Sequence, residues 1–372
     1  MKVLLVGDYS NYHAALAQGL RALGQDVTVA SDGCTWLRTA TDIDLSRRRG
    51  LLGGGILFAK TMTVLSRQLR GYDVVHFRAP NFIDLRPVWE QKILEKIARN
   101  NGRLFLSALS TDTALVRNLT SPNPALGYSE WQLGTQPTVW AASEGEARRR
   151  AWLAMTDYTE AFYSKMNGVV SALYEYHRIT QAEYPHLPLA YGGIPVDTSA
   201  LPAPRLHPAG DGPVRILYAV HKGREGEKGA DILLAILWRL ERELPGKVEI
   251  VTPPNMPYTD FVETLSKADI VCDQLYSYTP ATTALLAMAM GVVPLTGGEE
   301  EFYGFIGENE LRPSFNPDPR DPEGTYLRLK ELVLNRERLA KMSAQGPEFV
   351  ARHNDMRIVA QRFIDFWENK KP

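Results

Sequence analysis

Residues 268–298, ADIVCDQLYSYTPATTALLAMAMGVVPLTGG, constrain the fold more than any other stretch of the chain. Residues 270–272 and 292–295 are short apolar runs of the kind that form buried parallel strands. Between them, residues 281–290 are mostly strong helix formers, and Thr279-Pro280 offers a hydroxyl N-cap followed by proline at the first helical position. The stretch therefore predicts a strand–loop–helix–strand unit whose ligand site lies at the N-terminus of the helix.

Hydroxyl-bearing side chains gather at this predicted helix N-terminus. Backbone N–H groups that lack helical partners, together with hydroxyl groups, suit the binding of a phosphate. The candidate ligand-binding residues here are Tyr276, Tyr278, Thr279, Thr282 and Thr283.

The segment AMAMGVVPL, residues 287–295, resembles the AMACGxPVI segment of the family-four retaining glycosyltransferases. The resemblance implies a GT-B fold, an α/β architecture of two Rossmann-like domains that face a central cleft, with the nucleotide-sugar donor held by the second domain. Those enzymes carry a Glu-x(7)-Glu pair just before the segment, where this chain has Tyr278 and Leu286. We therefore expect Tyr278 to contact the donor directly and act in catalysis, Leu286 to belong to the core, and the donor ribose to be held less tightly.

A second segment, HKGREGEKGADILLAIL at residues 221–237, is similar to the G-R-x(4)-K-G-x-D-x-L-L segment of the same family. A departing nucleoside diphosphate develops negative charge, and fixed cations stabilise that charge. The resemblance implies that Arg224 and Lys228 hold the diphosphate. Because the arginine is displaced by one position from the family spacing, Lys222 is an alternative to it.

The beginning of the chain predicts a second unit of the same class. Apolar runs at residues 2–6 and 26–30 flank a helical pattern at 13–23, which is the spacing of a βαβ unit. It lacks G-x-G-x-x-G, so no dinucleotide is inferred. The unit resembles the N-terminal part of GT-B transferases, and its first loop supplies the acceptor-side candidates Ser10, Asn11 and His13. The alternative is that these residues only cap the helix.

Two further polar residues follow predicted strands and are candidates for catalysis. His76 ends residues 72–77, YDVVHF, which resemble the DVVHxH strand of the family, although Arg78 replaces the second histidine. Asp112 follows the strand predicted at 103–107, on the same edge of the sheet. The alternatives are a hydrogen-bonded core histidine and a helix-capping aspartate.

The chain is expected to form two domains. Residues 198–212, rich in proline and glycine, are typical of a linker. We expect an acceptor-side domain at 1–197 and a donor-binding domain at 213–353, with a helix at 354–370 that packs back on the first domain. Residues 118–148 lack periodicity and predict an insertion or acceptor-side loop, whose aromatic residues Tyr128, Trp131 and Trp140 pack in the core or stack on a sugar.

Charge excludes some partners and permits others. The net charge of −1 argues against a nucleic-acid-binding protein. Residues 1–195 carry 21 basic and 17 acidic residues, and residues 196–372 carry 21 and 26. Residues 47–70 combine three arginines with an amphipathic helix, which either packs on the sheet or contacts a membrane surface. Because no segment is long enough to span a bilayer and no signal peptide is evident, we expect a cytoplasmic protein, with peripheral contact at the inner membrane face as the alternative.

No spacing of Cys and His predicts a metal site, and Asp42-x-Asp44 matches a D-x-D motif by chance. The expected function is that of a metal-independent, hexosyltransferase-type glycosyltransferase of polysaccharide biosynthesis, without a cofactor. It would move a sugar, with retention, from a nucleotide-diphosphate sugar to a glycan or lipid-linked glycan. Two alternatives stay open: a non-catalytic nucleotide-sugar-binding protein, because Leu286 cannot accept a hydrogen bond, and a nucleotide-sugar epimerase using His76, Asp112 and His221.

Overall fold

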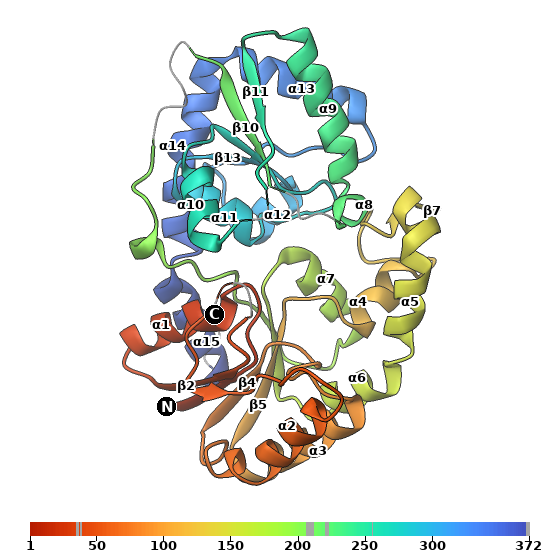
Figure 1. Ribbon diagram of the computed structural model, residues 1–372, viewed down its shortest axis with the longest axis vertical. Helices are drawn as coiled ribbons and strands as arrows, with labels where there is room; N and C mark the ends of the chain where they lie inside the picture. Colours follow the sequence, from red (N-terminus) through yellow and green to blue (C-terminus); the bar gives the residue numbers. More distant parts are fainter. Residues whose placement is uncertain (35–36, 38, 206–211, 220–222, 255, 370–372) are drawn as a thin grey trace. The chain divides into compact units, whose positions relative to one another are not determined.

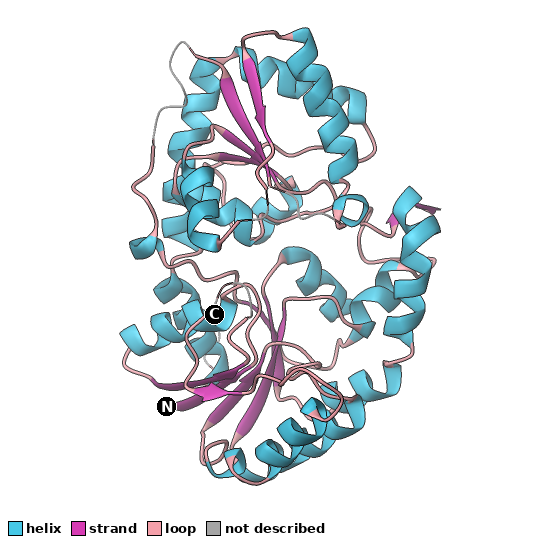
Figure 2. Cartoon of the chain, viewed as in Figure 1, coloured by secondary structure: helices cyan, strands magenta, loops and turns pink. Residues whose placement is uncertain are grey.

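The computed structural model describes residues 1–34, 37, 39–205, 212–219, 223–254 and 256–369 (Figure 1). The chain divides into two compact units. Unit 1 comprises Met1–Asn118, Arg149–Pro195 and Met356–Pro372, and unit 2 comprises Leu119–Arg148 and Val196–Asp355. Each is a parallel α/β unit with helices on both faces of its sheet (Figure 2).

Unit 1 is built on a seven-stranded parallel sheet with the order β3-β2-β1-β4-β5-β8-β9. The direction of strand addition reverses between β1 and β4, which pair in register from Val3 opposite Val74. This reversal is the topological switch point, where ligands bind outside the carboxyl ends of the strands in α/β sheets. The strands are β1 (Lys2–Val6), β2 (Asp26–Ser31), β3 (Ile43–Asp44), β4 (Val74–Phe77), β5 (Arg103–Ala108), β8 (Gly168–Ser171) and β9 (Leu189–Tyr191).

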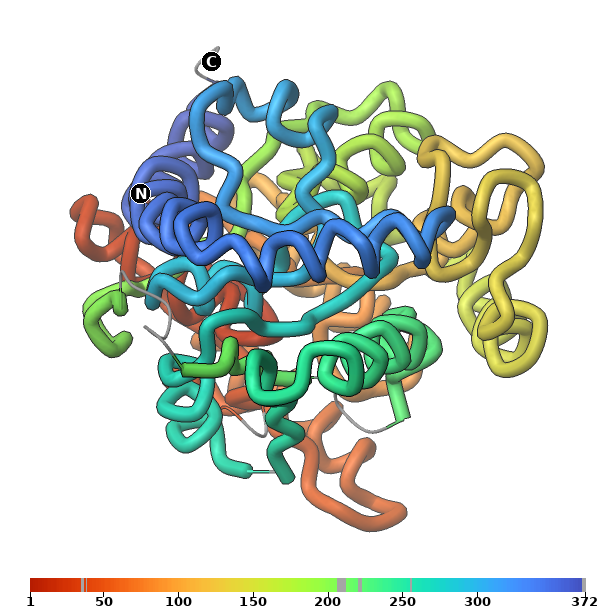
Figure 3. Tube along the Cα trace, turned by 90° about the horizontal axis from the view of Figure 1, so that it is seen from above, coloured from red at the N-terminus to blue at the C-terminus, as the bar shows by residue number. Residues whose placement is uncertain are grey.

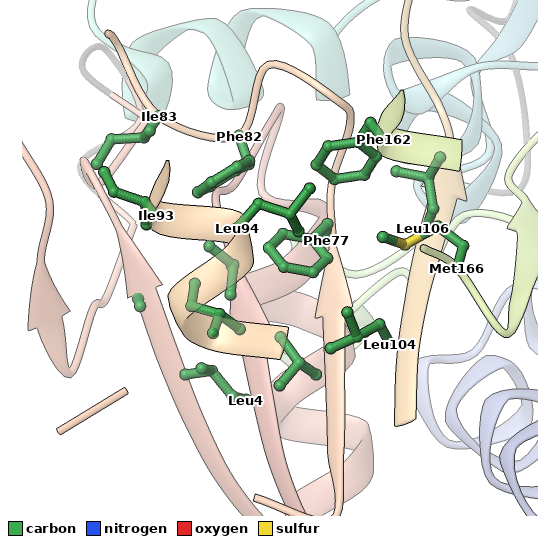
Figure 4. Packing of buried hydrophobic residues seen from close by; sticks show 14 of the residues in the cluster. Leu4, Phe77, Phe82, Ile83, Ile93, Leu94, Leu104, Leu106, Phe162 and Met166 are labelled. Atoms are coloured by element: carbon green, nitrogen blue, oxygen red, sulfur yellow. The ribbon is translucent and has the colours of Figure 1, made fainter. Parts of the chain in front are cut away.

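The helices of unit 1 cover both faces of this sheet. Alternate strand residues such as Val75 and Phe77 pack under α2, α3 and α6, and Figure 4 shows Phe77 among Phe82, Leu94 and Phe162. The helices are α1 (Tyr12–Ala22), α2 (Gly53–Met62), α3 (Pro87–Asn100), α4 (Thr113–Leu119), α6 (Thr156–Tyr163), α7 (Tyr174–Glu183) and α15 (Met356–Trp367), and α5 (Glu146–Leu153) begins in unit 2.

Helix α15 returns to unit 1 and packs along α1. The two helices approach closely at Gly19, where a Cβ atom would lie 2.1 Å from the carbonyl oxygen of Met356. Only glycine leaves room for this approach. The rings of Phe363 and Trp367 on α15 then reach the face of the sheet opposite α2 and α3.

Unit 2 is built on a four-stranded parallel sheet with the order β11-β10-β12-β13. Its strands are β10 (Val214–Tyr218), β11 (Val248–Val251), β12 (Ile270–Cys272) and β13 (Val293–Leu295). Seen from above, α13 and α14 form the blue stretch of the Cα trace (Figure 3). The helices are α8 (Glu225–Lys228), α9 (Ala230–Glu243), α10 (Tyr258–Ser266), α11 (Thr282–Ala289), α12 (Glu300–Phe305), α13 (Pro322–Leu334) and α14 (Arg336–His353).

The segment 119–148 belongs to unit 2, although the sequence assigned all of residues 1–197 to the first domain. It contains the short hairpin of β6 (Gln132–Leu133) and β7 (Gln136–Pro137), followed by a π-helix at Ala141–Gly145. Its aromatic residues Tyr128, Trp131 and Trp140 are buried, as core packing predicts. The stacking of Tyr128 on Tyr278 ties the segment to the rest of unit 2, which is the physical reason for the different boundary.

Candidate functional site

A buried ion pair stands at the carboxyl end of β12 in unit 2. Asp273 directly follows the strand, and its Oδ1 lies 2.9 Å from Nζ of Lys228, the last residue of α8. The Asp273 side chain is 2% exposed and that of Lys228 is 19% exposed. The other carboxylate oxygen, Oδ2 of Asp273, is buried and has no hydrogen-bond partner in the described part of the chain. The ammonium of Lys228 is therefore fixed at the strand edge, with two further N–H donors to offer.

The backbone holds Lys228 in this position as well. Its carbonyl oxygen accepts a hydrogen bond of 2.8 Å from the N–H of Leu275, in the loop after β12. The next residue, Gly229, has a φ of 63°, and a Cβ atom there would lie 2.8 Å from Cβ of Leu275. Glycine is required both by this left-handed backbone and by the close approach. The Lys-Gly pair of the sequence motif thus holds the start of α9 against the loop that follows β12.

Arg224, the second cation predicted to hold the diphosphate, pairs with a carboxylate. Its Nη2 lies 2.5 Å from Oε1 of Glu227, and Nη1 of Arg148 lies 2.6 Å from Oε2 of the same residue. Burial opposes ionisation of Glu227, but the hydrogen bond from Arg224 holds its pKa below the usual range. The alternative cation, Lys222, and His221 both lie outside the described residues.

Tyr278, predicted to contact the donor, packs against and hydrogen-bonds to the segment 119–148. Its ring stacks on that of Tyr128, with centroids 4.3 Å apart and planes at 16°, and its hydroxyl accepts a hydrogen bond of 2.9 Å from the N–H of Tyr128. The Tyr128 hydroxyl lies 2.8 Å from Oε1 of Glu299 and 3.0 Å from the carbonyl oxygen of Ser277, and its single proton can be donated to either of these acceptors. Burial raises the pKa of Tyr278, so the phenol stays neutral. Donor contact by this residue stays a prediction.

The helix after Tyr278 begins later than predicted. Helix α11 starts at Thr282, and Ala281 precedes it in an extended conformation, so Thr279-Pro280 does not form its N-cap. Proline restricts the residue before it to extended backbone, which keeps Thr279 out of the helix. Thr279 is 2% exposed, whereas Thr282 and Thr283 are partly exposed in the first turn, as is Tyr276 in the preceding loop. Leu286 lies in the core, as expected.

In unit 1, His76 is a core residue with no exposed surface. Its Nδ1 accepts a hydrogen bond from Nε1 of Trp367 at 3.3 Å, because an indole nitrogen only donates. Its Nε2 therefore carries the proton and donates to Oγ of Ser107 at 2.8 Å. Burial lowers the pKa of His76 well below its usual value. This placement corresponds to the alternative of a hydrogen-bonded core histidine, and we assign no catalytic step to it.

The other buried candidates of unit 1 also form hydrogen bonds within that unit. Asp112 accepts hydrogen bonds from the N–H of Leu115 at 2.9 Å and from the Tyr163 hydroxyl at 2.8 Å, which is the arrangement of a helix cap on α4. His13 is fully buried, and its Nδ1 donates to the carbonyl oxygen of Gly7 at 2.6 Å. Burial lowers the pKa of His13 to about 3. Ser10 and Asn11 take left-handed backbone angles, with φ of 51° and 66°.

The sequence analysis missed Asp8, the residue that organises the first loop. Its Oδ1 accepts hydrogen bonds from the N–H groups of Tyr9 at 2.8 Å and His13 at 2.9 Å. It therefore caps α1 in place of Asn11, which makes no side-chain capping bond in the described structure. Asp8 is 2% exposed, and its Oδ2 is buried without a partner among the described residues. The sequence did offer one signal for this residue, because Asp8 lies two positions beyond a predicted buried strand.

Within residues 1–369, outside the masked positions, no group of three His, Cys, Asp or Glu side chains is placed to hold a metal ion. None of the helices that the structure describes is both long enough and apolar enough to cross a membrane.

The two parallel α/β units define a GT-B fold, as comparison with solved structures shows. No model of a protein family matches the sequence, and no curated protein matches it. Among the similar structures is sucrose-phosphate synthase from Thermosynechococcus elongatus, with a TM-score of 0.62, 12% identity and 99% of both chains covered. Another is HepE from Anabaena in complex with UDP and glucose, with a TM-score of 0.58, 12% identity, and 99% of this chain and 100% of HepE covered.

The same comparison also reaches a different class of enzyme. The UDP-GlcNAc 2-epimerase from Neisseria meningitidis, bound to UDP-GlcNAc, has a TM-score of 0.52 and 12% identity, with 99% of this chain and 100% of the epimerase covered. At these identities the comparisons establish the fold, and the reaction has to be argued from the site.

Proposed function

We propose that the protein is a glycosyltransferase that moves a sugar from a nucleotide-diphosphate sugar to a glycan or lipid-linked glycan. The observation that carries this proposal is the Lys228–Asp273 pair, which fixes a cation at the carboxyl edge of the unit 2 sheet. That edge is where α/β sheets bind ligands, and a cation held there suits a diphosphate. The similarity to HepE, solved with UDP and glucose, supports the same class of donor.

In the proposed reaction, unit 2 holds the donor and unit 1 the acceptor. The negative charge of the leaving diphosphate is stabilised by the ammonium of Lys228, by the guanidinium of Arg224 and by the N–H groups of the first turn of α11. Because the cations are fixed before the reaction, little reorganisation is needed as the charge develops. We propose retention at the anomeric carbon, with the acceptor hydroxyl attacking from the face that the diphosphate leaves.

Nucleotide binding tests this proposal directly. We expect UDP or another nucleoside diphosphate to bind in isothermal titration calorimetry, and the corresponding monophosphate to bind more weakly. Substitution Lys228→Met should weaken diphosphate binding by about ten-fold or more, because hydrogen bonds to charged groups contribute about 1.5–3 kcal/mol. Lys267→Met is the matched control, since Lys267 is an exposed lysine on the same unit, paired with Glu263. Absence of binding by every nucleoside diphosphate would refute the proposal.

A nucleotide-sugar epimerase is the second candidate, favoured by the similarity to the 2-epimerase from Neisseria meningitidis. The two reactions differ when no acceptor is present. An epimerase converts the nucleotide sugar to its epimer, whereas a glycosyltransferase leaves it intact or hydrolyses it slowly. Proton NMR of a UDP-sugar incubated with the protein alone distinguishes these outcomes, and an unchanged spectrum despite tight binding favours a transferase or a non-catalytic binding protein. Transfer to an added glycan then identifies the transferase.

We also propose that catalysis needs no divalent metal, because Lys228 and Arg224 supply the positive charge that a metal would bring to the diphosphate. Transfer should therefore persist in EDTA. Loss of transfer on chelation, with recovery on adding Mg²⁺ or Mn²⁺, would contradict this part of the proposal.

We further propose that residues 47–70 contact an anionic membrane surface at the cytoplasmic face. Leu51 is 102% exposed and Leu52 is 76% exposed, and the neighbouring Arg48 and Arg49 are exposed as well. Apolar side chains beside arginines match a bilayer interface with acidic headgroups. The double substitution Leu51→Ser and Leu52→Ser should reduce sedimentation with phosphatidylglycerol vesicles, whereas Val139→Ser, at an exposed valine in unit 2, should not. Equal sedimentation with purely zwitterionic vesicles would argue against the charge contribution.

A further inference from the structure

A pocket of about 340 Å³ opens at the carboxyl edge of the unit 1 sheet. Arg78, in its lining, directly follows β4, and its side chain lies over Gly7, which directly follows β1. A Cβ atom at Gly7 would lie 2.6 Å from Cδ of Arg78, so glycine is needed for this contact. The pocket therefore lies at the β1/β4 switch point, the place where sheets of this kind bind ligands.

The pocket combines an apolar wall with polar groups. Phe82 and Ile83, labelled in Figure 4, belong to the wall together with Leu45 and Leu85. Its polar side chains are Asp32, Arg78, Asn81, Asp84 and Glu90. A sugar ring has the complementary surface, because its C–H groups pack on apolar side chains while its hydroxyls bond carboxyl, amide and guanidinium groups. The volume is at the lower end of the range for small-molecule sites, which suits one ring.

Glu90 is the most deeply buried polar residue of the lining, with 1% of its surface exposed. Its Oε1 accepts a hydrogen bond of 3.2 Å from the N–H of Ile83, and its carboxyl group also interacts with the hydroxyl of Tyr158 on α6. None of the ion pairs between described residues includes Glu90. Burial raises the pKa of Glu90 to about 8, so at neutral pH the group is a carboxylic acid that can donate a hydrogen bond as well as accept one.

Arg78 is held by main-chain oxygens. Its Nη1 donates to the carbonyl oxygen of Asp8 at 3.2 Å, and its Nη2 donates to that of Asn81 at 3.0 Å. Its Nε is buried without a partner in the described structure. Two aspartates line the pocket, but Asp84 pairs with Arg47 at 3.4 Å, so the fixed charges around the pocket are balanced. No excess of positive charge is therefore present to favour a phosphorylated or uronic sugar over a neutral one.

We propose that this pocket binds a single uncharged sugar ring, with Glu90 and Asn81 bonding its hydroxyls and Phe82 packing against its C–H face. In the proposed transfer reaction this ring belongs to the acceptor. That assignment rests on the proposed function, whereas the binding itself does not. The pocket thereby selects a neutral acceptor unit over an acidic one.

The test uses the full chain and simple methyl glycosides. Saturation-transfer NMR and calorimetry are run with methyl glucoside, methyl galactoside and methyl N-acetylglucosaminide, and with methyl glucuronide as the acidic counterpart. At least one neutral glycoside should bind, and the glucuronide should bind about ten-fold more weakly or worse. Leu85→Trp, which fills the pocket, and Glu90→Ala should each lower the affinity by about ten-fold or more, whereas Glu90→Gln should keep it within a few-fold. Glu95→Gln, on the same helix but outside the pocket lining, is the matched control and should leave binding unchanged.

A pH series gives an independent readout. Raising the pH from 7 to about 9.5 ionises Glu90, so the wild-type affinity for the neutral glycoside should fall while that of Glu90→Gln stays constant. Thermal unfolding of each variant shows whether it is folded, and the pH series on Glu90→Gln keeps the test decisive if Leu85→Trp fails to fold. Absence of neutral-glycoside binding, unchanged affinity in both Leu85→Trp and Glu90→Ala, or preference for the glucuronide would overturn the proposal.

The same measurements separate this proposal from the function proposed above. Nucleotide binding without glycoside binding overturns the pocket assignment and leaves the transferase proposal standing. Glycoside binding in the pocket without binding of any nucleotide supports the pocket assignment and refutes the transferase proposal.

Discussion

Nζ of Lys228 lies 2.9 Å from Oδ1 of Asp273, a carboxylate that is only 2% exposed. The sequence motif alone presents this lysine as an exposed loop residue with a role in diphosphate binding. The structure adds a second role, because the ammonium compensates a buried negative charge. Substitutions at this position are therefore expected to affect folding as well as ligand binding.

Lys228→Ala should lower the free energy of unfolding by about 1–3 kcal/mol, the cost of leaving a buried group without its partner. Urea denaturation measures this loss. Combining it with Asp273→Asn should recover part of the stability, since the buried charge is then removed. Lys267→Ala, at a pair whose side chains are 60% and 69% exposed, should change the free energy of unfolding much less. Equal stability of wild type and Lys228→Ala would show that the ion pair does not form in solution.

Tyr278→Phe should lower stability by about 1–3 kcal/mol, because the buried N–H of Tyr128 loses its acceptor while the ring stack is kept. In a transfer assay we expect this substitution to reduce the rate more than the nucleotide affinity. Tyr276→Phe, at a partly exposed tyrosine in the same loop, serves as the control for stability only. A fully active Tyr278→Phe variant would contradict the proposed donor contact, and unchanged stability would contradict the hydrogen bond.

Leu286→Glu introduces a carboxylate where the glycosyltransferases that the sequence resembles carry one, at a position that is 9% exposed. We expect a loss of stability of about 2 kcal/mol or more, because the new carboxyl group is desolvated. Leu286→Met, which keeps the volume, should cost less than about 1.5 kcal/mol. If the Glu variant folds, its preference for UDP over 2′-deoxy-UDP in calorimetry should increase. An undiminished stability of Leu286→Glu would show that this side of α11 is open to water.

The stability of the protein should depend on pH through Glu90. Its pKa is about 8 in the folded protein and 4.5 in the unfolded chain, so between these values the folded state holds a proton that the unfolded state has lost. The contribution of Glu90 to stability is therefore present in full below pH 4.5, falls as the pH rises to about 8 and is lost above it. Urea denaturation at several pH values should show a smaller decline for Glu90→Gln than for wild type, with Glu95→Gln matching wild type. Parallel curves for wild type and Glu90→Gln would contradict this.

The longer strands were predictable from sequence because a buried parallel strand is a continuous apolar run, whereas the two-residue strands β3, β6 and β7 were not predicted. Lys2–Val6 and Ile270–Cys272 have the predicted bounds, and β13 begins one residue later than predicted. The helix after β12 was predicted in type but not in its start, because the hydroxyl and proline signal of Thr279-Pro280 belongs to the loop. The assignment of segment 119–148 to unit 2 was not predictable, since Tyr128 finds its partner, Tyr278, 150 positions away.

The candidate site was also predictable only in part, because local sequence names some residues but not their distant partners. Lys228 and Arg224 could be named because the motif that contains them is local. The partner of Lys228 could be known only from the fold, since Asp273 lies 45 residues further along the chain. His76 looked like a strand-end site residue because the sequence shows its strand and not the ring of Trp367, which covers it from the far end of the chain. The proposed sugar pocket depends on Glu90, a helical glutamate with no motif around it.

Neither unit is a continuous piece of chain. Helix α15, which supplies Phe363 and Trp367 to the sheet of unit 1, is separated from the rest of that unit by residues 196–355. Ribosomal synthesis therefore delivers the whole of unit 2 before unit 1 can close over His76. A nascent chain released before α15 would expose an aromatic surface, and chaperones would be expected to recognise that surface until α15 is made. Unit 1 is therefore the first unit to emerge during synthesis and the last to be completed.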